Sequence, residues 1–369
     1  MKMGQKSSFG YLLKPSSCFI VFVAILFLFS GCINRDFQIS DPIPTKDLYG
    51  QIYLYGEAHS VEHILEEEFQ LWHNYYHNEG VRHLFIEYPY YFAEFLNLWM
   101  QSDSNDILDQ LYEDIQGTAG GTQETKAFYQ RIKEECPETI FHGTDVGHQY
   151  NTTGMRYLAY LVSVGRKDTE AYVLAQEAIA QGMNYYRNGD NDYAYRENVM
   201  TENFIREFDK LNGTDIIGIY GAPHTYLDSF DPTGTVPSMA TQLAEYYGTS
   251  LHTEDLSRLS QPIRIDTLEV SEKTYEASYF GKMDITSFST EYQFREYWRL
   301  ENAYDDFKDC LTTGQVLPYS NYPMVIEAEQ VFVIDFTKTD GSVERMYFRS
   351  DGNTWNNLPT TEEFTIAFP

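Results

Sequence analysis

The residues that could perform chemistry follow apolar runs of sequence, at the points where those runs end. Four runs end in such groups: Glu57 and His59 after residues 52–55, Glu87 after 84–86, Asp145 and His148 after 139–142, and His224 after 216–220. An imidazole held beside a carboxylate can move protons near neutral pH. The same residue types can also bind a divalent metal ion. The pattern therefore predicts either acid–base chemistry on water or a metal-assisted version of it.

The four apolar runs are typical of buried strands, and helical patterns lie between them. We expect helices over about 60–79, 90–101, 123–135 and 153–211, the last interrupted near 188–190. Strands alternating with helices predict an α/β fold, with a central mostly parallel sheet and helices on both faces. The carboxyl ends of parallel strands lie along one edge of the sheet, where ligands bind. Residues far apart in the sequence are therefore expected to meet in one pocket.

The pattern changes after about residue 260. Strands are expected at 331–336, 345–348 and 364–367 without helices between them. We therefore predict an α/β domain over 48–260 and a β-rich extension over 261–369, whose antiparallel strands complete or flank the main sheet.

Each polar group also has a purely structural explanation. Glu57 could satisfy amides at the start of the following helix, and Asp145 could cap the next one. Glu87 is harder to explain in this way, because an unpaired buried carboxylate is costly. We expect Asp145 and His148 to support the site from behind the reacting groups.

One helical segment carries a further candidate. Arg196, Met200 and Asn203 are spaced i, i+4 and i+7, so they share one helix face. If that face covers the pocket, Arg196 could bind a carboxylate or stabilise an oxyanion. The alternative is an exposed arginine paired with a neighbouring acid on the helix surface.

The N-terminus has the pattern of a secretory signal. Lys2, Lys6 and Lys14 precede an apolar run over 18–29, and Ser30-Gly31-Cys32 follows. The run is shorter than the roughly 20 residues that a membrane-spanning helix needs. We predict a signal peptide over 1–31, lipidation of Cys32 and a tether over 32–47. The protein is then a bacterial cell-envelope lipoprotein, anchored in the membrane and facing outside the cytoplasm.

Composition limits the partners. The 369 residues include 55 acidic and 26 basic ones, a formal net charge of −29, which repels phosphate backbones and disfavours nucleic acid. After lipidation of Cys32, Cys136 and Cys310 remain, and they could form one disulfide or stay as separate thiols.

The motifs together resemble a known superfamily. Gly56-Glu57-Ala58-His59, Glu87, the helical run from Arg196 to Asn203, and Gly221-Ala222-Pro223-His224 resemble the erythromycin esterase-like proteins over about residues 50–255. They are also similar to the ChaN-like haem-binding lipoproteins and the TIKI proteases. Only Ala58 separates the motif glutamate from the histidine, whereas the esterases usually have two residues there. That spacing looks more like the ChaN and TIKI branches.

The resemblance implies that His59 is a general base, with Glu57, Glu87, Arg196 and His224 shaping and polarising the site. The leading hypothesis is a hydrolase that acts on an ester, lactone or peptide bond of a small-molecule or peptide substrate. A divalent ion such as Mn, Co or Zn could assist, held by Glu57, His59, Glu87 and His224. The alternatives are a haem- or tetrapyrrole-binding lipoprotein, with Tyr88 and Tyr91 near the iron, and a non-catalytic envelope binding protein.

Overall fold

The computed structural model describes residues 50–187, 191–286, 289–355 and 358–366. The predicted signal peptide, Cys32 and the tether lie outside these residues, so lipid anchoring stays a prediction. Within the described ranges, no helix combines the length and the apolar character needed to cross a membrane.

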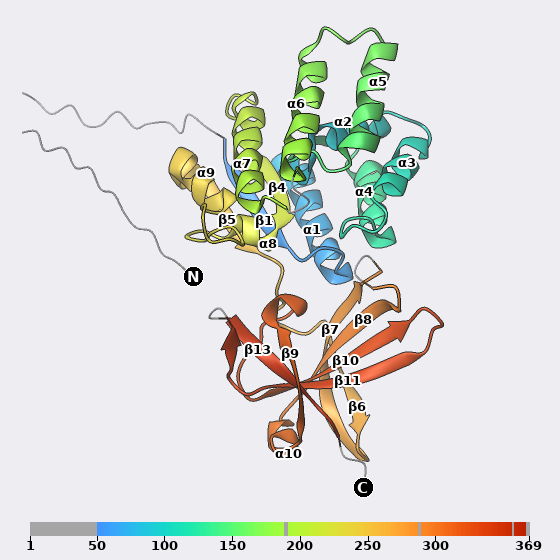
Figure 1. The fold of residues 1–369 in the computed structure, drawn as a ribbon, viewed down its shortest axis with the longest axis vertical. Helices are drawn as coiled ribbons and strands as arrows, with labels where there is room; N and C mark the ends of the chain where they lie inside the picture. The colour runs from blue at the N-terminus through green and yellow to red at the C-terminus, as the bar shows by residue number, and fades with distance from the viewer. Residues whose placement is uncertain (1–49, 188–190, 287–288, 356–357, 367–369) are drawn as a thin grey trace, which may run out of the picture. The chain divides into compact units, whose positions relative to one another are not determined.

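A five-stranded parallel sheet forms the centre of the N-terminal part (Figure 1), as predicted. Its strands are β1 (Ile52–Glu57), β2 (His83–Pro89), β3 (Ile140–Asp145), β4 (Ile216–Gly221) and β5 (Leu251–Asp255). Their order is β3-β2-β4-β1-β5, and every neighbouring pair is parallel. The apolar runs of the first four strands are the buried centre of this sheet. β5 was not predicted, because its sequence is polar and it lies at the edge of the sheet.

Helices cover both faces of this sheet, as the alternating pattern predicted. They are α1 (Glu62–Asn74), α2 (Tyr90–Met100), α3 (Asp106–Asp114), α4 (Gln123–Glu135), α5 (Met155–Ser163), α6 (Glu170–Tyr185), α7 (Tyr193–Asp209), α8 (Ala222–Thr225) and α9 (Met239–Tyr247). Alternation along β2 shows the two faces, because Leu84 and Ile86 join one apolar core and Phe85 joins the other.

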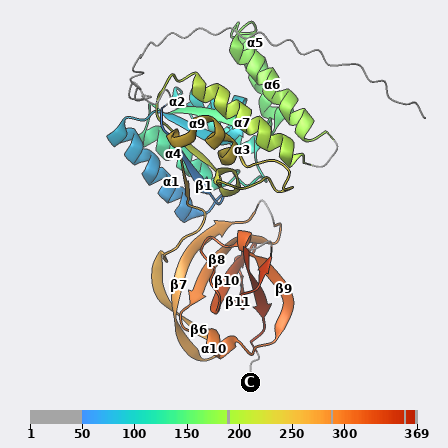
Figure 2. The ribbon, with the colours of Figure 1, turned by 90° about the vertical axis from the view of Figure 1, so that its left-hand side faces the viewer.

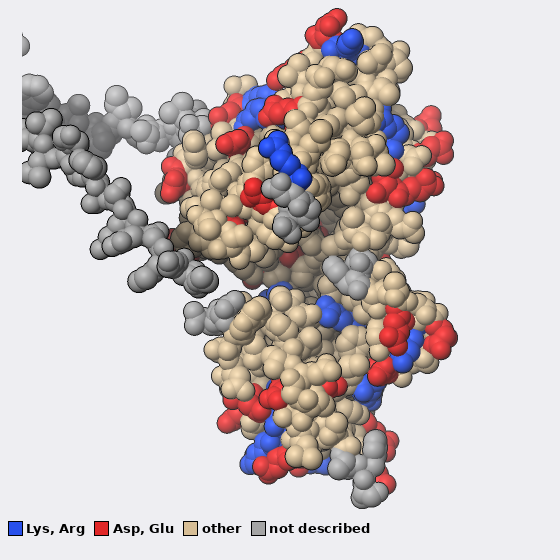
Figure 3. Space-filling view, in the orientation of Figure 1, with Lys and Arg blue, Asp and Glu red and all other residues tan. Residues whose placement is uncertain are grey.

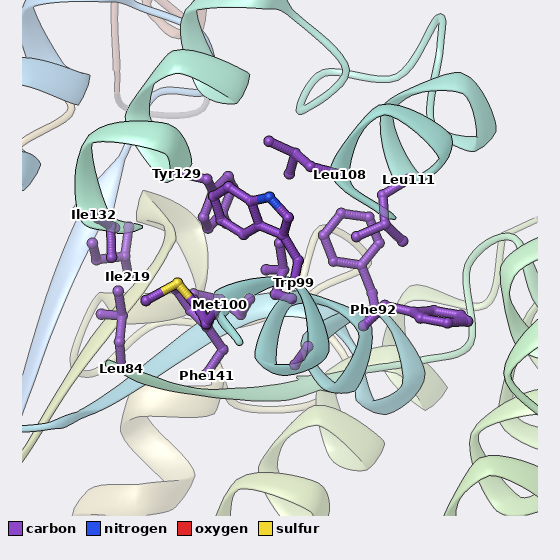
Figure 4. Close-up of a cluster of buried hydrophobic side chains, with 14 of the residues drawn as sticks. Leu84, Phe92, Trp99, Met100, Leu108, Leu111, Tyr129, Ile132, Phe141 and Ile219 are labelled. Atoms are coloured by element: carbon purple, nitrogen blue, oxygen red, sulfur yellow. The ribbon is translucent and has the colours of Figure 1, made fainter. Parts of the chain in front are cut away.

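The larger core packs α1 to α4 against the sheet. In Figure 4, Phe92 and Trp99 of α2 lie with Leu108 and Leu111 of α3. The sequence had not predicted α3, whose few apolar residues lie among acidic ones. The smaller core packs α7 and α9 against the opposite face.

The long helical segment predicted over 153–211 is three helices. A π-helical turn over Tyr150–Gly154 leads into α5. Gly165 then adopts a left-handed φ of 74°, a conformation that ends helices readily because glycine has no Cβ. The predicted interruption at 188–190 lies outside the described residues.

The C-terminal part forms its own antiparallel sheet, which is strongly curved (Figure 2), and does not complete the parallel one. Its strands are β6 (Arg264–Val270), β7 (Lys273–Asp284), β8 (Tyr292–Leu300), β9 (Thr312–Pro318), β10 (Gln330–Lys338), β11 (Val343–Ser350), β12 (Thr354–Trp355) and β13 (Leu358–Phe364), with the short helix α10 (Tyr304–Phe307). The predicted strand over 364–367 is wrong: β13 ends at Phe364. Most of β13 was not predicted, because its residues Pro359-Thr360-Thr361-Glu362-Glu363 do not form an apolar run.

Cys136, which is buried, and Cys310 are both free thiols. Figure 3 shows acidic side chains spread over one face of the molecule, with basic ones among them and no broad basic patch.

Candidate active site

A cavity of about 340 Å³ lies where the carboxyl ends of β1, β2 and β3 meet. Seven of the predicted site residues line it: Glu57, His59, Glu87, Tyr88, Asp145, His148 and Arg196. They come from three strand ends and from α7, separated by up to 139 positions in the sequence. The parallel sheet therefore brings distant polar groups to one place.

Local structure at the end of β1 sets the position of Glu57 and His59. Gly56 passes close to α8, and a Cβ at Gly56 would lie 2.4 Å from Thr225 Oγ1, so only glycine fits there. Ser60 then turns the chain with a left-handed φ of 60°. Gln149, at φ 51°, also lines the cavity in this conformation. Non-glycine residues adopt it at a cost, which is often found at functional sites.

Glu57 and His59 form a hydrogen-bonded pair, with His59 Nδ1 and Glu57 Oε1 2.8 Å apart. Burial alone would lower the pKa of His59, but attraction to Glu57, the hydrogen bond to Glu57 and the nearby Glu87 outweigh it and raise the pKa to about 9. His59 is therefore an imidazolium at neutral pH in the free protein. A general base must first lose that proton, which refines the predicted role.

Arg196 lies between two carboxylates. Its Nε donates to Asp145 Oδ1 at 2.9 Å and its Nη2 to Asp145 Oδ2 at 2.7 Å, and Nη2 also donates to Glu87 Oε1. Burial opposes ionisation of both acids. The guanidinium, followed by His148, still holds the pKa of Asp145 well below its usual range, and His224, followed by the guanidinium, does the same for Glu87. Arg196 is thus a buried cation that fixes two acids, and not the exposed arginine of the alternative interpretation.

Helix α7 places Arg196 in its first turn. Asp192 caps the helix by accepting from Tyr195 N at 3.0 Å. Two turns along the same face, Asn203 Nδ2 donates to Thr144 O at 2.9 Å, one residue before Asp145. Met200 packs in the core between them. The predicted shared face of α7 therefore lies against the ends of the strands.

Glu87 also connects to His224, outside the lining of the cavity. Gly221 N donates to Glu87 Oε2 at 2.5 Å, and His224 Nε2 lies 3.5 Å from Glu87 Oε1. His224 Nδ1 is 2.7 Å from Glu197 Oε2. Burial opposes the charge on His224, but these two acids raise its pKa to about 10. His224 is thus a buried cation held between carboxyl groups.

Two of these groups lie close to Gly221. A Cβ on Gly221 would lie 3.1 Å from Glu87 Oε2 and 3.3 Å from His59 Nε2. Any side chain at this position would therefore press on both His59 and Glu87.

His148 and the two tyrosines have different surroundings. His148 Nε2 is 3.0 Å from Asp145 Oδ2 and its Nδ1 is 2.5 Å from Tyr186 Oη, which agrees with a supporting position. Tyr88 lines the cavity and stacks on Phe92. Tyr91 is 0 % exposed, donates its hydroxyl to His148 O and is absent from the described lining residues. Of the two predicted haem contacts, only Tyr88 faces the cavity.

The predicted metal ligands do not fit a metal site. Among the described residues, no three His, Cys, Asp or Glu side chains are arranged to hold an ion. Both oxygens of Glu87 accept hydrogen bonds from within the protein, and both ring nitrogens of His224 face carboxylates. Instead, these side chains form a network of hydrogen bonds and ion pairs within the protein.

Two buried acids of this network were missed. Glu68 lines the cavity, and Glu197 holds His224 and accepts from Met239 N at 2.5 Å. Each is 2 % exposed. Glu68 belongs to an acidic run that is typical of a solvent-exposed helix face. However, it is four residues after Ile64 and four before Trp72, both of which are buried. That spacing was the available signal.

Comparisons with known proteins give structural neighbours only. No protein-family model matches the chain, and no curated protein does. A Bacillus cereus protein has a TM-score of 0.44 at 12% identity over 87% of each chain. A mutant erythromycin esterase in its open conformation has a TM-score of 0.42 at 12% identity, over 68% of this chain and 82% of its own. A succinoglycan biosynthesis protein has a TM-score of 0.41 at 16% identity, over 62% and 70%. The structural neighbours thus include an erythromycin esterase, at low identity.

Proposed function

We propose that the protein is a hydrolase of ester, lactone or peptide bonds, in which His59 exchanges a proton with the attacking water. One observation carries the proposal: His59, whose Nδ1 is paired with Glu57, lines a cavity together with Glu87 and Arg196. A water molecule in that cavity would meet a proton acceptor at Nε2 once His59 is neutral. Glu57 Oε1 then holds the remaining proton on Nδ1, which fixes the tautomer that the reaction needs.

His59 can account for each proton transfer in the proposed reaction. Neutral His59 takes one proton from water at Nε2 while the water oxygen bonds to the carbonyl carbon. The bond to the leaving group then breaks, and the Nε2 proton passes to the leaving oxygen or nitrogen. Of the two groups considered for the oxyanion, Arg196 lines the cavity, whereas His224 is held between Glu87 and Glu197.

The sequence also supports a setting for this activity. We infer from the signal pattern and Cys32 that the protein is tethered to the bacterial envelope. The site would then meet small molecules or peptides outside the cytoplasm.

The proposal is tested by a substrate panel with the purified full-length chain. Nitrophenyl esters, simple lactones and peptide nitroanilides would be assayed with and without added Mn²⁺, Co²⁺ or Zn²⁺. Saturable turnover of at least one class is expected. Absence of turnover across all three classes would remove the proposal.

The rate should depend on pH through the charge of His59. Because the base is the neutral imidazole, and the pKa of His59 is raised to about 9, kcat/KM should increase with pH and level off above about 9. In Glu57→Gln the attraction that raises this pKa is gone, so the midpoint should move to lower pH. A pH–rate profile of both proteins measures this. A rate that falls with pH across that range would contradict a base role for His59.

Gly221→Ala should block the reaction without unfolding the protein. Gly221 has φ −51° and ψ 132°, which alanine adopts freely, so the backbone tolerates the change. The new methyl group would lie 3.1 Å from Glu87 Oε2 and 3.3 Å from His59 Nε2, so these two groups would have to move. We expect kcat to fall by about 100-fold or more, in line with misplacement of a reacting group. Thermal unfolding serves as the control, and normal kcat would mean that the reaction does not depend on the positions of His59 and Glu87.

A further inference from the structure

A second cavity lies within the C-terminal sheet and shares no described lining residue with the active-site cavity. Its volume of about 610 Å³ is in the range of about 300–1,000 Å³ that is usual for sites of small ligands. β9 and β13, which pair in the curved sheet (Figure 1), form one side of it. Thr360 is paired with Pro318 and Glu362 with Val316. Because side chains alternate along a strand, these four residues share one face of the sheet.

The cavity contains a buried cation that is held in a fixed position. Arg349 of β11 lines the cavity, and its side chain is only 9 % exposed. Its Nε donates to both carboxylate oxygens of Asp351 at 3.0 Å. Its Nη1 donates to the backbone oxygens of Phe307 at 3.0 Å and Cys310 at 2.8 Å. Nη2 has no acceptor among the described groups, so this rigid guanidinium keeps one donor free for a ligand.

Two other polar side chains of the lining also have no partner in the described part of the chain. They are the Asn353 amide and the Glu362 carboxylate. Glu362 lies opposite Arg349 in the pairing of β13 with β11, but the ion pair of Arg349 is made with Asp351. The lining therefore presents planar donors and acceptors whose hydrogen bonds are available to a bound molecule.

An exposed tryptophan completes the lining. Trp355 of β12 lines the cavity and is 62 % exposed, whereas the other three tryptophans of the chain, Trp72, Trp99 and Trp298, are at most 8 % exposed. No other aromatic ring of the described residues stacks on Trp355. Contact of this large apolar ring with water is unfavourable. A ligand that covers the ring would therefore gain binding free energy.

This combination of side chains selects one class of ligand. A sugar ring has an apolar C–H face, which fits a flat aromatic ring, and a rim of hydroxyl groups that each donate and accept hydrogen bonds. A purely apolar ligand would leave the polar groups of the lining without partners. An acidic ligand would be repelled, because the lining has two carboxylates, Asp351 and Glu362, and one cation, Arg349.

We propose that this cavity binds a neutral oligosaccharide, which stacks a sugar ring on Trp355 and hydrogen-bonds to Arg349 and Glu362. The site is separate from the one assigned to hydrolysis and has none of its residues. The proposal therefore does not depend on whether the protein is a hydrolase.

The first test uses the fluorescence of Trp355 in the purified full-length chain. Because the other tryptophans are buried, quenching by acrylamide reports mainly on Trp355. Cellohexaose, mannohexaose and N-acetylchitohexaose are the neutral ligands, and hexagalacturonate is the acidic one. At least one neutral sugar should protect Trp355 saturably, and the acid should bind about tenfold or more weakly, because like charges across an interface are unfavourable. No protection by any neutral sugar, or tighter binding of the acid, would overturn the proposal.

The second test locates the site by calorimetry with the best neutral sugar. Trp355→Ala should weaken binding by about 30-fold or more, as expected for a tryptophan at the centre of a binding site. Glu362→Ala should weaken it by about fivefold through the loss of one acceptor. Both side chains lack partners in the fold, so the variants should unfold at the wild-type temperature.

Ile265→Ala is the matched control for both variants. Ile265 of β6 is also 62 % exposed, and it does not belong to the described lining of this cavity. Its replacement should leave the affinity for the sugar unchanged. Wild-type affinity in Trp355→Ala, or an equal loss of affinity in Ile265→Ala, would mean that the sugar binds elsewhere and would overturn the proposal.

Discussion

His59→Gln should abolish hydrolysis, with kcat lowered by about 10³-fold or more, because general base catalysis contributes about 10²–10⁴-fold. Glutamine can still hydrogen-bond to Glu57 but cannot take a proton from water. The protein should remain folded, since the His59 side chain is 38% exposed. Some stability should be lost at neutral pH, because the raised pKa of His59 means that its charge favours the folded state. Steady-state kinetics on the best substrate of the panel, together with thermal unfolding, measure both effects.

His63→Gln is the matched control for this prediction. His63 is also a partly exposed histidine paired with a glutamate, Glu67, at 3.1 Å, and it does not belong to the described lining of the cavity. Its replacement should leave kcat unchanged. If both variants retain activity, the reacting base is another residue and the role assigned to His59 is wrong.

Arg196→Met should cause the largest loss of stability, about 3–5 kcal/mol, as expected when one partner of a buried ion pair is removed. The substitution keeps the length of the side chain but removes the guanidinium that joins Asp145 and Glu87, which leaves His148 beside Asp145 and His224 beside Glu87. Chemical denaturation should show a lower midpoint. The loss should shrink as the pH falls. The lowered pKa values of the two acids stabilise the wild type only while the acids are ionised, so this stability disappears in acid. In the variant the same acids take up protons more readily, because the guanidinium is gone.

Arg206→Met provides the comparison on the same helix. Arg206 pairs with Glu177 at 2.9 Å near the surface, and exposed pairs contribute about 0–1 kcal/mol. This variant should therefore unfold close to the wild type. Equal destabilisation by both substitutions would mean that the ion pairs of Arg196 do not hold α7 to the sheet.

Much of the parallel sheet could be predicted because its strands are continuous apolar runs. Buried parallel strands need such runs, and a carboxylate that follows one, such as Glu87, is conspicuous. The edge rule for parallel sheets then predicted that Glu87 and Asp145 would approach each other. Arg196 was found from helical spacing alone. These inferences needed only local pattern and one general rule of topology.

Other features depend on contacts that no local pattern records. Glu68 and Glu197 look like ordinary surface acids until the helices that carry them are packed. The charge of His59 follows from its closeness to Glu57 and Glu87, which outweighs burial, and these are properties of the folded chain. The strands of the second sheet carry polar residues on one side, so β13 was hidden by its threonines and glutamates.

The ion network around Arg196 is also costly to the fold. Apolar side chains of similar size in place of Glu87, Asp145 and Arg196 together would be expected to leave a protein at least as stable, because buried ion pairs seldom outperform good apolar packing. Such a protein would have no charge at these three positions, at the ends of β2 and β3 and on α7. A homologue that no longer needs the activity would be free to accumulate these apolar substitutions. Retention of the three charged residues in a homologue would therefore indicate that its pocket is still functional.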